Sequence, residues 1–143
     1  MKLLSAIKYL LVFLLFAGMG CKENLIEQTF TVGEESTFRI NQIYTSSDGQ
    51  YTFQINEIND SRCPEGVVCF WSGEVAINGE WIVNKNRTIV ELHSVLKDQQ
   101  KEPGGFSIQI VDVKPYPKFG TINEPKDLVI TLLISKKLGT ANL

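Results

Sequence analysis

The sequence GEVAINGEWIVNKNRTIVELH, residues 73–93, carries the clearest sign of how this chain folds. Apolar and polar residues alternate over 75–83, which is the period-two pattern of a strand with one buried face. We expect one long strand over 73–83, in which Gly79 falls on the apolar side and marks a bend or a bulge. A hairpin turn at Asn78-Gly79 is the alternative, because this dipeptide favours two-residue turns.

Strand-like segments continue on both sides of these residues. Residues 84–86 are a second turn candidate, and the next strand is expected over 87–93. Apolar residues also recur at period two in five further segments, namely 29–32, 38–43, 51–58, 106–113 and 128–134. The last segment is apolar on both faces and is therefore expected at the centre of a sheet.

Two of these segments resemble each other. FRINQI (38–43) and FQINEI (53–58) have similar patterning, and a turn is predicted between them over 45–50. We expect them to form the two arms of one hairpin. Each would contain a bulge where the apolar phase breaks before the last apolar residue.

The whole pattern predicts an all-β domain. Residues 95–105 and 118–126 are expected to be loops, and 90–99 is the only segment that could hold a helical turn. Seven or eight short strands with turns between them are typical of an antiparallel β-sandwich of the Ig-like or Greek-key type, with a β-barrel as the alternative.

The N-terminal residues predict a location. Lys2 and Lys8 supply positive charge, residues 9–17 are continuously apolar, and small residues stand just ahead of Cys21. This is the pattern of a secretory signal peptide, and a cysteine at its end resembles the attachment site of bacterial lipoproteins. We therefore expect residues 1–20 to be a lipoprotein signal peptide and Cys21 to be the lipidated N-terminus.

Two alternatives stay open for this segment. An uncleaved membrane anchor needs about 20 mostly apolar residues, whereas Lys8 interrupts this one. Cleavage by an ordinary signal peptidase near Gly20 would instead leave Cys21 as a free thiol.

Lipidation implies a division of the chain and a membrane surface. Residues 21–27 are the expected lipidated tether, 28–137 the β-sandwich domain and 138–143 a C-terminal tail. Two or three acyl chains, such as palmitate, would make the attachment effectively permanent. In enterobacterial lipoproteins, Asp after the cysteine favours the inner membrane. Lys22 stands there in this chain, which implies the outer membrane and leaves the periplasmic or surface face open.

The charge of the chain argues against nucleic acid as a partner. The signal segment holds two of the 14 basic residues and none of the 16 acidic ones, so residues 21–143 carry a net charge of about −4. Binding to phosphate backbones needs clustered Lys and Arg, and no basic cluster stands out in the sequence.

The two cysteines of the mature domain are expected to pair. Cys63 and Cys69 would lie in an oxidising compartment, where a disulfide is the default. The chain-entropy estimate for so short a ring is about 2–2.5 kcal/mol of stabilisation.

The residues around this pair form a motif. The sequence CPEGVVCFWSGE over 63–74 resembles C-P-x-x-V-x-C-x-W-x-G-E, a pattern of small uncharacterised envelope lipoproteins of Bacteroidota and related bacteria. The matching residues are Cys63, Pro64, Val67, Cys69, Trp71, Gly73 and Glu74. VKPYP over 113–117 resembles a second shared element, and the resemblance covers 28–136. It implies an antiparallel β-domain and brings no assigned activity.

Two interpretations of this motif follow from its residues. As a scaffold, Trp71 would pack its ring into the core over the disulfide. As a contact surface, the loop would present Val67, Val68 and Phe70 outward. Thiol exchange is the weakest option, because oxidoreductases use a two-residue spacing between cysteines. A second candidate contact loop holds Tyr116 and Phe119.

The sequence contains no recognisable catalytic, metal or cofactor motif. His93 is the only histidine, and its neighbour Ser94 would point to the opposite face of a strand. G-x-S-x-G, zinc-ligand, calcium-loop and phosphate-loop patterns are missing. A carboxylate pair for glycoside cleavage stays open, since any two acidic residues could meet in space. We expect no enzyme and no cofactor.

These observations predict a membrane-anchored, non-catalytic binding or interaction module of the bacterial cell envelope. Its partner would be an envelope protein, a peptide or a glycan, contacted through loops at one end of the sandwich. The alternatives are a structural envelope protein without a dedicated ligand and, less favoured, a small-ligand carrier or hydrolase, which would need a deep pocket.

Overall fold

The computed structural model describes residues 28–95 and 103–137. The predicted signal peptide (1–20), the lipidation site Cys21, the tether (21–27) and the tail (138–143) lie outside the described residues.

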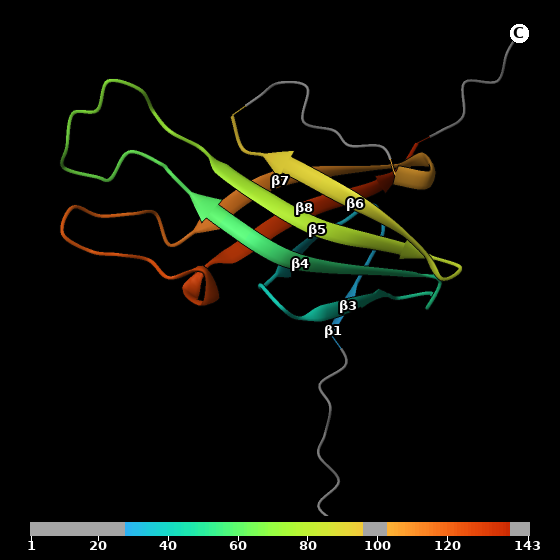
Figure 1. The fold of residues 1–143 in the computed structure, drawn as a ribbon. Helices are drawn as coiled ribbons and strands as arrows, with labels where there is room; N and C mark the ends of the chain where they lie inside the picture. The colour runs from blue at the N-terminus through green and yellow to red at the C-terminus, as the bar shows by residue number, and fades with distance from the viewer. Residues whose placement is uncertain (1–27, 96–102, 138–143) are drawn as a thin grey trace, which may run out of the picture.

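The described residues form two packed β-sheets (Figure 1). The strands are β1 (Gln28–Phe30), β2 (Glu35–Phe38), β3 (Ile43–Ser46), β4 (Tyr51–Asp60), β5 (Val75–Val83), β6 (Asn86–His93), β7 (Phe106–Lys114) and β8 (Val129–Lys136). One sheet has the order β1-β3-β4-β5-β6 and the other β2-β8-β7. All neighbours are antiparallel except β1 and β3. The predicted all-β sandwich is confirmed.

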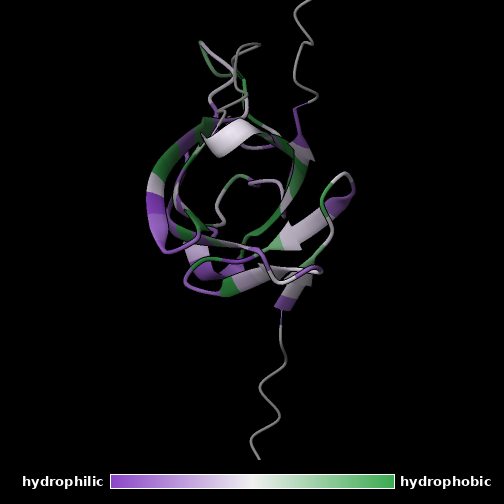
Figure 2. Cartoon of the chain, turned by 90° about the vertical axis from the view of Figure 1, so that its right-hand side faces the viewer, coloured by the Kyte–Doolittle hydropathy of each residue, from purple (hydrophilic) through white to green (hydrophobic). Residues whose placement is uncertain are grey.

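Alternating side chains of both sheets fill the space between them. Along β5, buried residues alternate with half-buried ones, as the period-two pattern predicts. Trp81 of β5 lies at the centre of the core, with its ring centroid 5.1 Å from that of Phe106 of β7 and 6.1 Å from that of Phe30. Seen nearly along the strands, the two sheets curve around this core (Figure 2).

The long strand expected at 73–83 is confirmed as β5, and the hairpin at Asn78-Gly79 does not form. A Cβ atom on Gly79 would lie 2.7 Å from the backbone oxygen of Gln54, so only glycine fits at this point of the pairing between β4 and β5. The bulge itself lies on the partner strand, where the register between β4 and β5 shifts between Ile55 and Glu57. β5 turns into β6 through Asn84 and Lys85, which both have positive φ.

The expected strand over 38–43, with its bulge, is wrong. Phe38 ends β2 in the three-stranded sheet, whereas Ile43 begins β3 in the five-stranded sheet. Asn41, with φ of 60°, lies in the connection between them. The break in apolar phase therefore records a crossing from one sheet to the other, and the predicted hairpin of 38–43 with 53–58 is replaced by the hairpin of β3 with β4.

The last strand is central in its sheet, as expected. β8 pairs with β2 on one side and β7 on the other. β7 contains a register shift between Ile110 and Asp112, which explains why its apolar residues change phase. Two short 3-10 turns, η1 (Pro103–Gly105) and η2 (Pro125–Asp127), precede β7 and β8.

Candidate functional site

Two loops lie together at one end of the sandwich. The disulfide loop (residues 61–74) connects β4 to β5, and the β7–β8 loop (residues 115–128) connects β7 to β8. Figure 1 shows both at the left end, the first in green and the second in orange. We call them together the loop pair.

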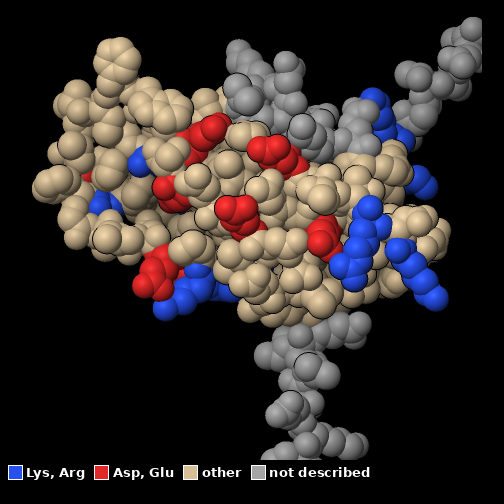
Figure 3. Space-filling view, in the orientation of Figure 1, with Lys and Arg blue, Asp and Glu red and all other residues tan. Residues whose placement is uncertain are grey.

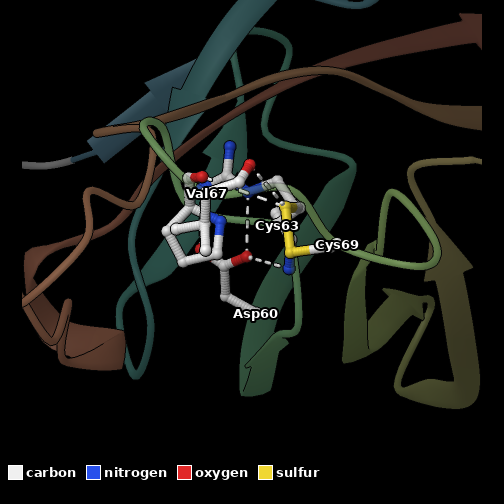
Figure 4. Close-up of a disulfide and its surroundings, with 6 residues drawn as sticks. Asp60, Cys63, Val67 and Cys69 are labelled. Carbon is white, nitrogen blue, oxygen red and sulfur yellow. Dashed lines mark hydrogen bonds and ion pairs between the residues drawn. A yellow bond between two sulfur atoms is a disulfide. The ribbon is translucent and has the colours of Figure 1, made fainter.

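The disulfide loop begins as a continuation of the β4–β5 ladder. The Ser61 amide donates to the Glu74 carbonyl at 2.8 Å, and the Cys63 amide donates to the Ser72 carbonyl at 2.8 Å. Beyond these bonds, Cys63 and Cys69 form the predicted disulfide, with 2.13 Å between the sulfur atoms (Figure 4). The loop is thus closed at its base by backbone hydrogen bonds and further out by the disulfide.

Backbone hydrogen bonds join the two loops to each other. The Glu65 amide donates to the Pro117 carbonyl at 2.9 Å, and the Phe119 amide donates to the Glu65 carbonyl at 3.2 Å. This pairing forms an isolated parallel bridge between Glu65 and Lys118. The two loops therefore present their side chains as one surface.

Arg62 connects the same two loops through its side chain. Its guanidinium donates to both carboxylate oxygens of Asp60, at 2.8 and 2.7 Å, and to the carbonyls of Val113 and Pro115, at 2.7 and 3.0 Å. It also lies over the ring of Tyr116, 4.8 Å from the centroid. Both charged side chains are only 10% exposed. This nearly buried arginine, hydrogen-bonded at all three guanidinium nitrogens, holds the β7–β8 loop against the disulfide loop.

The loop pair carries most of the exposed large hydrophobic side chains that the structure describes. Seven of these eleven lie in it: Val67 (40% exposed), Val68 (100%), Phe70 (107%), Trp71 (63%), Tyr116 (43%), Phe119 (76%) and Ile122 (90%). On the face shown in Figure 3, uncharged residues (tan) cover most of the left end of the molecule, with a few charged side chains among them. Scattered exposed hydrophobics are ordinary, but a cluster of this kind indicates a contact surface.

The scaffold interpretation of Trp71 is wrong. Gly73 has a φ of +68°, and a Cβ there would lie 1.9 Å from the Ser61 carbonyl oxygen, so the chain turns sharply just before β5. Trp71 lies beyond that turn, outside the alternation of the strand, and its ring remains in solvent. The central core position is occupied by Trp81 instead.

The other predicted contact residues lie where the contact interpretation places them. Val67, Val68 and Phe70 are exposed, and the structure brings them to the same end as Tyr116 and Phe119. Sequence reasoning missed Trp71 and Ile122 as members of this surface. The available signal was that both are large apolar residues inside segments expected to be loops.

A shallow hollow lies beside the cluster. It measures about 530 Å³ and is lined by residues of both loops and of β7 and β8, including Glu65, Lys118, Tyr116 and Val129. Close to it, the Lys114 ammonium lies 3.0 Å from the Asp112 carboxylate, and this hydrogen bond lowers the pKa of Asp112 below its usual value.

His93 lies on β6 among carboxylates. Its Nδ1 is 3.2 Å from Glu74 and its Nε2 is 3.4 Å from Glu91. The neighbouring Ser94 points elsewhere, since its hydroxyl oxygen accepts the Val75 amide at 2.8 Å. His93 and Ser94 therefore do not form a nucleophile–base pair in this structure.

Metal and membrane signals are missing from the described part of the chain. Within 28–95 and 103–137, no group of three or more His, Cys, Asp and Glu side chains is placed to hold a metal ion. The same ranges contain no helix that has the length and apolarity to cross a bilayer. In comparisons with known proteins, no family model, no curated protein and no solved structure matches this chain.

Proposed function

We propose that this protein is a lipid-anchored, non-catalytic interaction module of the bacterial cell envelope, and that the loop pair is its contact surface. Cys21 would carry the lipid, and residues 28–137 would form the module. The N-terminal signal pattern supports the anchor, and the exposed cluster supports the contact surface.

The observation that carries the proposal is the way Val68 and Phe70 are presented. Both side chains are fully exposed, on a loop that is held by a disulfide and bonded to its neighbour. Burying exposed apolar surface of this kind in a complex lowers the free energy by about 25 cal/mol for each Å² removed from water. A loop that is already ordered loses little conformational entropy on binding, so the bound state is favoured over the unbound state with the apolar side chains in water.

Site-specific photocrosslinking in cells tests the contact surface. A benzophenone amino acid in place of Phe70 or Phe119 should give a specific crosslinked product in the native envelope. Ile89 provides the matched control, since it is 80% exposed but lies on β6, outside the loop pair. Equal or absent crosslinking at all three positions, under several growth conditions, would favour a structural protein without a dedicated ligand.

Mass spectrometry of the protein from its native membrane tests the anchor. We expect a chain that begins at Cys21 and carries two or three acyl groups. A chain that begins at Cys21 without acyl groups, or a chain that still contains residues 1–20, would contradict the lipid anchor. The contact surface would then still be tested by crosslinking.

A further inference from the structure

We propose that the apolar tip of the loop pair inserts into the phospholipid surface of the membrane in which the chain is anchored. The inference rests on the proposed function, because it names the partner of the same contact surface. The tip consists of residues 64–72 and 115–123.

The first argument is the shape of the tip. Val68 and Phe70 contact almost nothing in their own domain. At a protein interface such side chains would have to be immobilised in matching pockets, at a cost in rotamer entropy for each one. In the boundary between lipid headgroups and acyl chains they can leave water and still keep their rotamers, so a projecting apolar tip suits a fluid partner better than a rigid one.

The second argument is the composition of the tip. Each of its two segments has a single charged residue, Glu65 in one and Lys118 in the other. Trp71 and Tyr116 carry aromatic rings with a polar atom, the side chains that concentrate at membrane interfaces. Lys118 stands between the aromatic residues Tyr116 and Phe119, where its stem can lie along apolar surface while its ammonium reaches the headgroups.

The third argument limits the depth of insertion. The loop pair is irregular backbone, and only part of its backbone groups are paired, by the amides of Ser61, Cys63, Glu65, Phe119, Thr121, Asp127 and Leu128. Unpaired backbone groups cannot enter the hydrocarbon core without a large cost. The tip therefore reaches the headgroup and upper acyl region with its side chains while its backbone stays at the surface.

The fourth argument is where the tether meets the domain. Residues 21–27 can span at most about 25 Å, and the described chain begins at Gln28. Lipidation of Cys21 would therefore keep Gln28, and with it the whole domain, within about that distance of the bilayer. Such tethering raises the effective concentration of the tip at the membrane surface, so that even weak insertion is populated.

Trp71 offers a direct reporter of this insertion. The chain has two tryptophans, and Trp81 is buried in the core while Trp71 is exposed at the tip. The full-length protein would be purified from membranes and reconstituted into vesicles of phosphatidylethanolamine and phosphatidylglycerol, with and without phosphatidylcholine brominated on its acyl chains. The emission of the wild type minus that of Trp71→Phe then reports Trp71 alone.

We expect brominated lipid to remove most of the Trp71 emission and aqueous iodide to remove little of it. The double variant Phe70→Ser, Phe119→Ser should reverse both results, because it takes away two apolar side chains of the tip. Ile89→Ser is the matched control and should leave the quenching unchanged. All three residues are exposed, so these substitutions do not disturb the core.

Trp71 that is quenched by iodide and insensitive to brominated lipid would overturn the inference. A protein crosslinked through position 70, together with a water-exposed Trp71 on vesicles, would overturn it in favour of a protein partner and leave the proposed function standing. Lack of lipid quenching together with lack of any crosslink at positions 70 and 119 would contradict both.

Discussion

At the scale of single residues, Arg62 does the most to shape the candidate surface. Its guanidinium makes four hydrogen bonds, two to the Asp60 carboxylate, one to the Val113 carbonyl of β7 and one to the Pro115 carbonyl of the β7–β8 loop. A lysine cannot reproduce this planar geometry. Asp60 is as little exposed as Arg62, so each charge depends on the other for its burial.

Replacing Arg62 by Met should therefore destabilise the domain strongly. The substitution keeps the length of the side chain but leaves the Asp60 carboxylate buried and unpaired, which costs about 3–5 kcal/mol. Arg87→Met is the control, because the ion pair of Arg87 with Glu80 is exposed and contributes about 0–1 kcal/mol. Urea unfolding of both variants measures the difference, and equal free energies of unfolding would show that Arg62 does not hold the two loops together.

Asp48 makes the stability of the domain depend on pH in the acidic range. Its carboxylate accepts hydrogen bonds from the Ser46 hydroxyl at 2.5 Å and the Gln50 amide at 3.1 Å, and these bonds lower its pKa below the usual 3.8. A carboxyl with a lower pKa in the folded state stabilises the fold above its unfolded pKa, and that contribution is lost as pH falls through the folded value.

The variant Asp48→Asn isolates this contribution. The difference in unfolding free energy between wild type and variant should be constant from pH 7 down to about 5 and should shrink below about pH 4. Chemical denaturation at a series of pH values measures it, and the other carboxyl groups cancel because both proteins contain them. A difference that stays constant down to pH 2 would contradict the assignment.

At the scale of elements, the pairing of β4 with β5 depends on one glycine. Next to the register shift between Ile55 and Glu57, the backbone of Gln54 and the ring of Phe53 lie close against Gly79. The close approach leaves no room for a side chain, although the backbone of Gly79 itself is not in the left-handed region.

Gly79→Ala should consequently cost about 1–3 kcal/mol, the usual penalty of overpacking a well-filled interior. The new methyl group would lie 2.7 Å from the Gln54 oxygen and 3.0 Å from a Phe53 ring carbon. The neighbouring Asn78→Ala removes only an exposed hydrogen bond to Glu57 and should cost less than about 1 kcal/mol. Thermal unfolding of the two variants distinguishes them, and a neutral Gly79→Ala would refute the close approach.

At the scale of the whole molecule, the two sheets are held together by a cluster of aromatic rings. Across the two sheets, the ring centroids of Phe53 and Phe38 lie 5.5 Å apart and those of Trp81 and Phe106 lie 5.1 Å apart. Among the described residues, the Trp81 indole nitrogen has no hydrogen-bond partner, so Trp81 stabilises the core through its apolar area and its ring contacts.

The two tryptophans should therefore differ sharply in their effect on stability. Trp81→Ala opens a cavity at the centre of the core and should cost about 3–5 kcal/mol. Trp71→Ala removes an exposed ring and should stay within about 0.5 kcal/mol of the wild type. Equilibrium unfolding followed by circular dichroism compares them. A large loss for Trp71→Ala would mean that its ring packs against the domain after all.

Local patterns in the chain were enough to predict the all-β class, the long strand β5, the central position of β8 and the disulfide. Each depends on features that lie close together in the sequence, such as a period of two or a pair of cysteines six residues apart. The contact-surface interpretation of the motif also predicted that Val68 and Phe70 point outward. The assignment of strands to sheets could not be predicted in the same way. In residues 38–43 the apolar alternation changes phase, and the sequence looks the same whether the cause is a bulge within one strand or a passage from one sheet to the other.

The sequence alone therefore determines the type of element at most positions and predicts an envelope lipoprotein, because periodicity and signal patterns are properties of neighbouring residues. The joining of the two loops was settled only in the folded chain: Arg62 meets Val113 and Pro115 more than 50 residues away. Which distant segments meet depends on how the sheets pack and where the chain crosses between them. That packing also placed Trp81 in the core and left Trp71 at the tip.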